Sequence, residues 1–212
     1  MLPVFGSAQV AFIELESKTV PEPNVKDTAV ENWNRAQPGY GRLSKEGREM
    51  LYWTNYARRN PVEFWNNAIQ PILEAFPTLN RNEAVTLKAA LMMVGPLPMF
   101  VLNKVLVATA QSHADDIGKK KAPLGHNSTN GANFGSRMTA AGIKYCANEN
   151  ISLCSQSVLL SMVLLYLDIG VADLGHRKTL LNPVLHEMGV GSAQYGKEEN
   201  QYFIVQDFAC KQ

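Results

Sequence analysis

Apolar residues recur along much of this chain at the spacing of buried helix faces. Met50, Trp53 and Ala57 follow one another at three- and four-residue intervals, which predicts a helix in this part of the chain. The same periodicity across residues 99–121 predicts one long amphipathic helix. The stretch from Val158 to Leu167 is almost wholly apolar and favours a buried helix. Helices therefore account for most of the pattern.

The end of the chain has a different pattern, rich in β-branched and aromatic residues. The segments "EMGVGSAQY" and "NQYFIVQDFA", joined by the polar "GKEEN", predict an antiparallel hairpin, and "ANENIS" is typical of a third strand. Helices around one small sheet indicate an α+β fold. We expect a three-layer α/β/α sandwich with a small antiparallel central sheet.

The N-terminal segment lacks both patterns. Four prolines interrupt residues 1–42, which we interpret as an extended arm or leader remnant lying against the domain. Residues 43–212 are then the folded domain, since a chain of 212 residues suits one substantial core. No positively charged region or clean cleavage site marks an intact signal peptide.

Composition narrows the function classes. A net charge of +1 gives no electrostatic argument for binding nucleic acid. The longest apolar run is shorter than the roughly 18 residues that a membrane span requires, so no membrane span is expected. Three cysteines leave open a bridge from Cys146 to Cys154 or to Cys210, which would indicate an oxidising compartment, or three buried free thiols.

Four residues in loops or at element ends could form a polar site: His126, Glu149, Asp168 and His176. Two imidazoles and two carboxylates suit a divalent metal such as zinc, with His126 and His176 as ligands and a position left for water. The two histidines are 50 residues apart, so only the fold can bring them together.

For three other polar residues, a structural role is favoured over a role in a site. His113 lies on the apolar face of its predicted helix, as a hydrogen-bonded core histidine would. Arg177 could bind an anion, but a salt bridge to Glu187 is the favoured prediction. Ser128 follows His126 closely, yet nothing in the sequence supplies the oxyanion hole that a catalytic serine needs.

Four motifs occur in the order "GHNSTNGANFGSRMTAAGI", "ANENIS", "LLYLDIGVADLGHRKTLLNPVLHEMGVG" and "YFIVQDFA". In this order they resemble the CAP superfamily, also called SCP-like, which includes cysteine-rich secretory proteins, insect venom antigens and plant pathogenesis-related proteins. The bacterial SCP-like branch is the most similar, and the resemblance runs from about Leu43 to Cys210.

The resemblance implies an α/β/α sandwich whose central cleft gathers two histidines and two acidic residues. By motif, His126, Glu149 and His176 match three of these positions. Asp168 is the nearest candidate for the fourth position, and Asp173 is its rival.

The family likeness implies a secreted or surface-exposed binding module, extracellular or periplasmic, for a lipid, peptide or protein ligand. No common reaction is implied. The alternative is a metal-dependent hydrolase in which water is activated between His126 and His176, with Glu149 as general base. A third possibility is an interaction domain in which the polar cluster serves only the fold.

Overall fold

The computed structural model describes residues 15–24, 26–196 and 201–212. Its helices are Thr28–Arg35 (α1), Lys45–Arg59 (α2), Pro61–Phe64 (α3), Gln70–Ala75 (α4), Asn82–Val94 (α5), Lys104–Lys120 (α6), Phe134–Ala140 (α7), Val158–Leu167 (α8) and Gly175–Leu180 (α9). Its strands are Val101–Leu102 (β1), Ala147–Cys154 (β2), Glu187–Gln194 (β3) and Tyr202–Ala209 (β4). Short 3-10 turns at Tyr40–Arg42 and Pro77–Leu79 and a π-helical turn at Trp65–Ile69 complete the described elements.

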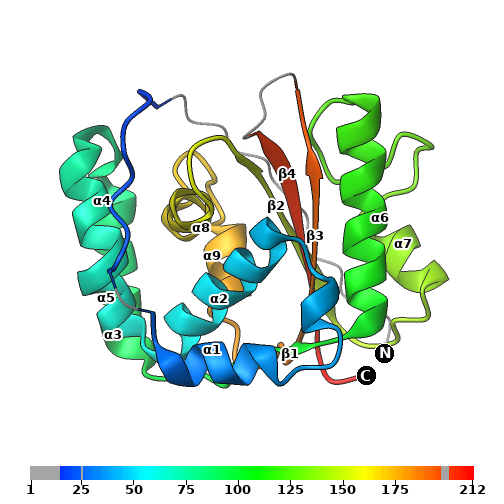
Figure 1. Ribbon diagram of the computed structural model, residues 1–212, viewed down its shortest axis with the longest axis horizontal. Coiled ribbons are helices and arrows are strands. Elements are labelled where there is room, and N and C mark those ends of the chain that lie inside the picture. The colour runs from blue at the N-terminus through cyan, green and yellow to red at the C-terminus, as the bar shows by residue number, and fades with distance from the viewer. Residues whose placement is uncertain (1–14, 25, 197–200) are drawn as a thin grey trace.

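The elements form three layers with the sheet in the middle (Figure 1). Helix α6 packs on β3 and β4, with α7 beside it, and α2, α8 and α9 cover the other face. The largest apolar core lies on the α2 and α8 side, where Met50, Trp53 and Tyr166 are buried. The predicted α+β class and three-layer sandwich are confirmed.

The sheet is mixed rather than purely antiparallel, which corrects one expectation. Its strand order is β1-β3-β4-β2, with β4 antiparallel to both neighbours but β1 parallel to β3. The amide of Val101 donates to the carbonyl of His186, and Asn103 then caps α6 by accepting from the amide of Val105. The helix predicted across residues 99–121 therefore begins only at Lys104, because its first residues pair with β3.

Helix α6 lies directly on the backbone of β3 because two glycines make room for it. A Cβ atom at Gly189 would overlap the backbone of Leu106, and one at Gly191 would overlap that of Ala110. This close approach fixes the position of α6, and with it Thr109, over the middle of the sheet.

The N-terminal segment is not extended throughout, contrary to expectation. Residues Thr28–Arg35 form α1 because Asp27 caps the helix, its Oδ1 accepting from the amides of Ala29 at 2.8 Å and Val30 at 3.0 Å. Val30 is fully buried and α1 packs against α2. Of the predicted arm, residues 1–14 and residue 25 lie outside the described part of the chain.

A disulfide joins Cys146, just before β2, to Cys210, just after β4, with the two Cα atoms 5.5 Å apart. The amide of Cys210 also donates to the carbonyl of Cys146 at 2.9 Å. Cys154 is a buried free thiol. Because β2 is extended, Cys146 and Cys154 lie at its opposite ends, and this excludes the other pairing that the sequence left open.

Candidate functional site

The first histidine, His126, is held by a carboxylate on the sheet. It lies in the loop between α6 and α7, and its Nδ1 is 2.8 Å from Oε1 of Glu149 on β2. The His126 side chain is 11% exposed and that of Glu149 is 0% exposed. The pair thus lies under the surface, where hydrogen bonds and charges interact more strongly than in water.

Arg137 on α7 completes this first cluster by binding the other oxygen of Glu149. Its Nη2 pairs with Oε2 of Glu149, and its Nη1 donates to the carbonyl of His126 at 2.7 Å. One guanidinium therefore binds both the carboxylate and the loop that carries the histidine. Burial raises the pKa of Glu149, and the charge of Arg137 opposes that rise.

Asp207 on β4 lies directly opposite Glu149 in the sheet. It is fully buried, and burial, together with the charge of Glu149, raises its pKa well above the usual range. Its Oδ2 accepts from the hydroxyl of Thr109 at 2.6 Å. We infer that Asp207 is neutral, since two adjacent carboxylates would repel each other.

Sequence reasoning did not select Asp207 or Arg137 as site residues. A signal was present for Asp207, because it is the only acidic residue in the strand segment "YFIVQDFA". Acidic side chains are rarely buried unless they are paired. Arg137 lies in α7, and nothing in the sequence pattern connects it to a glutamate on β2.

The second histidine, His176, pairs with a carboxylate close to it in the chain. Its Nδ1 is 2.5 Å from Oδ1 of Asp168, and Oδ2 of Asp168 accepts from the amide of Arg177 at 2.9 Å. Asp168 ends α8 with a φ of 56°, and His176 lies in the first turn of α9. The rival Asp173 accepts instead from the amide of Gly175, so Asp168 is the carboxylate that contacts His176.

The two histidine–carboxylate pairs are attached to opposite faces of β2. Glu149 points toward α6 and α7, where it contacts Arg137. Its neighbour Asn148 donates to Thr179 Oγ1 of α9 at 2.9 Å, and Asn150 donates to the carbonyl of His176 at 3.5 Å. Successive side chains of a strand alternate between its faces. The fold thus brings each predicted histidine to a predicted carboxylate and separates the two pairs by the strand.

The described residues do not fit a catalytic metal centre. Catalytic zinc sites have three protein ligands and an open position. Within residues 15–24, 26–196 and 201–212, no group of three or more His, Cys, Asp or Glu side chains could hold a metal ion.

His113 is a buried core histidine, as expected. Its Nε2 is 3.0 Å from the carbonyl of Gly125 and its Nδ1 is 3.3 Å from the hydroxyl of Ser128. Burial lowers the pKa of His113 to about 4, so it is neutral at pH 7. The amide of Ser128 donates to the carbonyl of Ala132, so it is already engaged within the loop.

Arg177 does not form the predicted salt bridge with Glu187. Its guanidinium is buried and donates to the carbonyls of Tyr166, Leu167 and Glu83, which join the end of α8 to the start of α5. The carboxylate of Glu187 accepts from Asn103 instead. Arg177 therefore satisfies carbonyl groups that the end of α8 leaves free and ties this end to the first turn of α5.

Within the part of the chain that the structure describes, no helix is both long enough and apolar enough to cross a membrane. The family model for CAP, the cysteine-rich secretory protein family, matches residues 95–208, which is more than half of the chain. No curated protein matches the sequence.

Solved structures that are similar to this chain include two of extracellular or venom-type proteins. An extracellular protein containing a SCP domain from Bacillus anthracis str. Ames is 26% identical, with a TM-score of 0.39, and the match covers 54% of this chain and 35% of the other. This chain thus matches about a third of the length of the Bacillus anthracis protein. Venom allergen-like protein 4 of Schistosoma mansoni is 15% identical, with a TM-score of 0.46, and the match covers 79% of this chain and 90% of the other.

Proposed function

Because this chain belongs to the cysteine-rich secretory protein (CAP) family, we propose that it is an extracellular binding module whose recognition surface is the loop from Gly125 to Asn133. We call this segment the His126 loop. The observation that carries the proposal is the buried Glu149, which binds His126 and Arg137 together beneath the loop. The family membership supports a binding function, and the geometry of the loop supports its assignment as the recognition surface.

The His126 loop is held rigidly for a surface segment. Arg137 donates to the carbonyl of His126, the amide of Ser128 donates to Ala132, and the amide of Gly131 donates to Ser128. The amide of Thr129 donates to the carboxylate of Asp116 on α6 at 2.6 Å. A loop already fixed in one conformation loses little entropy when it binds a ligand.

The exposed groups of the loop favour a polar ligand. Asn127 and Asn130 are exposed, and their side-chain amides are suited to hydrogen bonds with a peptide. The hydroxyl of Thr129 is already bonded to Asp116 and Lys120. A lipid would require a sizeable apolar surface at the same place. We therefore propose a peptide or a protein segment as the ligand.

Two observations support a location outside the cytosol. The disulfide between Cys146 and Cys210 is of the kind that persists in oxidising compartments. The Bacillus anthracis protein to which this chain is similar is described as extracellular. We propose that this chain is secreted or exposed at a cell surface.

The hydrolase alternative has less support because the described residues provide no three-ligand metal group. Zinc calorimetry on the parent protein, His126→Ala and His176→Ala tests this alternative directly. Stoichiometric zinc binding that is lost in both variants would favour a metal site shared by the two histidines.

A selection from a random peptide library tests the binding proposal. We expect selected peptides to bind the parent protein and to bind the double variant Asn127→Ala, Asn130→Ala at least tenfold more weakly. Asn66→Ala, an exposed asparagine in the helical segment after Pro61, is the matched control and should bind as the parent does. Peptides that bind the loop variant and the parent equally would contradict the proposal.

A further inference from the structure

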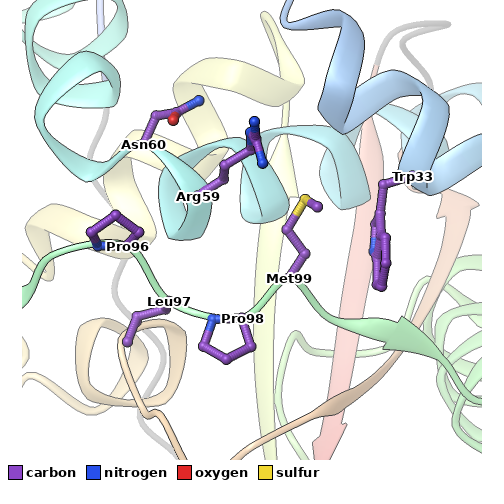
Figure 2. A pocket seen from close by; sticks show the side chains of 7 residues that line it. All are labelled: Trp33, Arg59, Asn60, Pro96, Leu97, Pro98 and Met99. Atoms are coloured by element: carbon purple, nitrogen blue, oxygen red, sulfur yellow. The ribbon is translucent and has the colours of Figure 1, made fainter.

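A groove on the surface, distinct in its lining from both histidine pairs, lies between α1, the end of α2 and the segment before β1. It is lined by Trp33, Arg59, Asn60 and the four residues Pro96, Leu97, Pro98 and Met99, and its volume is about 510 Å³. We call it the Trp33 groove. Figure 2 shows the segment from Pro96 to Met99 along one side, Arg59 and Asn60 along the other, and Trp33 beyond Met99. Grooves of this volume are large enough for a small organic molecule.

The apolar side of the groove is held in place by the helix beneath it. The amide of Leu97 donates to the carbonyl of Arg58 at 2.7 Å. The amide of Phe100 donates to Oδ1 of the buried Asn55, also at 2.7 Å. The proline rings of Pro96 and Pro98 fix their own φ angles, which further restricts the backbone near these two hydrogen bonds. The segment thus presents a preformed wall of two proline rings, Leu97 and Met99.

Trp33 supplies a flat aromatic surface beside this wall. Its indole Nε1 donates to the carbonyl of Phe100 at 3.1 Å, which fixes the position of the ring. The residue is 41% exposed, whereas the other two tryptophans, Trp53 and Trp65, are buried. A fixed and exposed indole favours an aromatic ligand, because ring pairs gain contact energy beyond their buried area.

Arg59 supplies the only charge that lines the groove among the described residues. Its side chain is 44% exposed, and its Nε is 3.7 Å from Oδ2 of Asp27. The carboxylate of Asp27 is already engaged, because it caps α1 and accepts from Asn60 Nδ2 at 2.7 Å. In the described part of the chain, the two terminal nitrogens of Arg59 have no hydrogen bond or ion pair. Two such nitrogens match the two oxygens of a carboxylate.

We propose that the Trp33 groove binds a small aromatic carboxylate, with the ring against Trp33 and the prolines and the carboxylate on Arg59. One cation beside an apolar wall is complementary to an acid that carries a single ring. This site goes beyond the binding function proposed for the His126 loop and shares no residue with it.

Titration with 3-phenylpropionate, followed by the NMR signals of the three indole N–H groups, tests this proposal. The Trp33 signal, identified by its loss in Trp33→Phe, should shift with a Kd below about 1 mM, as expected for a ligand of this size. The signals of Trp53 and Trp65 should stay in place. No shift of the Trp33 signal at 10 mM ligand would overturn the proposal.

Two controls separate the contributions of ring and charge. Butyrate lacks the ring and 3-phenyl-1-propanol lacks the charge, so each should bind at least tenfold more weakly than 3-phenylpropionate. Arg59→Gln should weaken binding at least tenfold, whereas Arg35→Gln, which removes an exposed arginine outside the groove, should leave the Kd unchanged. Equal affinity of the parent and Arg59→Gln, or equal affinity for the acid and the alcohol, would show that no carboxylate site exists there.

Discussion

The two histidine–carboxylate pairs consist of the same chemical groups, but they connect different parts of the fold. His126 and Glu149 are 23 residues apart and join a surface loop to the sheet. His176 and Asp168 are 8 residues apart and join the end of α8 to the start of α9. The first pair adds two partners from other elements, Arg137 and Asp207, whereas Asp168 adds the neighbouring amide of Arg177.

This difference indicates whether the carboxylate of each pair must be negatively charged. A permanent charge, Arg137, is nearly buried beside Glu149, so the first cluster needs a negative carboxylate. In the second pair, Asp168 contacts a histidine and a backbone amide, and neither of them requires a charged partner. The buried guanidinium of Arg177 also interacts with the charge of Asp168, but its hydrogen bonds go to carbonyl groups instead. We therefore expect a neutral amide of the same shape to be tolerated at Asp168 and poorly tolerated at Glu149.

The largest effect is expected for Glu149→Gln. It keeps the shape of the side chain but leaves Arg137 without its counter-ion, which should cost about 3 to 5 kcal/mol of unfolding free energy. Urea denaturation measures this loss. The double variant with Arg137→Gln should lose clearly less than the sum of the single losses, and Glu63→Gln, at an exposed position, is the control. A loss under 1 kcal/mol would contradict the charge argument.

Asp168→Ala should cost about 2 to 3 kcal/mol, because two hydrogen bonds are lost and alanine must adopt a φ of 56°. Urea denaturation at pH 7 checks this value. Lys178→Ala, at an exposed position of α9 that is not bonded to Asp168, should lie within about 0.5 kcal/mol of the parent. Equal stability of the two variants would show that Asp168 is not the local cap described above.

Asp207→Asn should change how stability depends on pH. The native pKa of Asp207 is raised, so its contribution is fully present below the unfolded pKa, near 4, and is lost as pH rises toward the native pKa. Asparagine has the shape of the neutral acid but does not titrate. Relative to the parent, the variant should gain up to about 1.4 kcal/mol per pH unit above pH 4. Parallel stability curves from pH 4 to pH 7 would rule out a neutral Asp207.

The smallest effect is expected for Asp168→Asn. Asparagine tolerates the left-handed conformation and can still accept from the amide of Arg177, while a change of tautomer lets His176 accept from its side-chain amide. The loss should stay under about 1 kcal/mol by urea denaturation. A loss as large as that of Asp168→Ala would mean that the negative charge matters here as well.

The fold was largely predictable because its main elements have strong local patterns. The apolar run of α8 and the hairpin of β3 and β4, rich in β-branched and aromatic residues, appear where they were expected. Strand β1 was not predictable, because its two residues count as a strand only through their pairing with β3. Helix α1 was missed because the surrounding prolines dominate that segment, although Asp27 before "TAVENWNR" is a recognisable cap.

The candidate site was predictable in its parts but not in its arrangement. Loop position and family resemblance together selected His126, Glu149, Asp168 and His176. Which carboxylate each histidine contacts depends on the alternation of side chains along β2 and on the course of the loops. Arg137 and Asp207 belong to the site only because contacts between different elements bring them there. Local periodicity in the sequence does not predict such contacts.

Amide hydrogen exchange in the His126 loop tests the account most directly. The amides of Ser128 and Gly131, both hydrogen-bonded within the loop, should exchange at least tenfold faster in Glu149→Gln than in the parent. In Asp168→Asn they should exchange at the parent rate. Equal exchange in all three proteins would contradict the claim that the Glu149 cluster, and not the Asp168 pair, fixes the loop proposed to bind ligand.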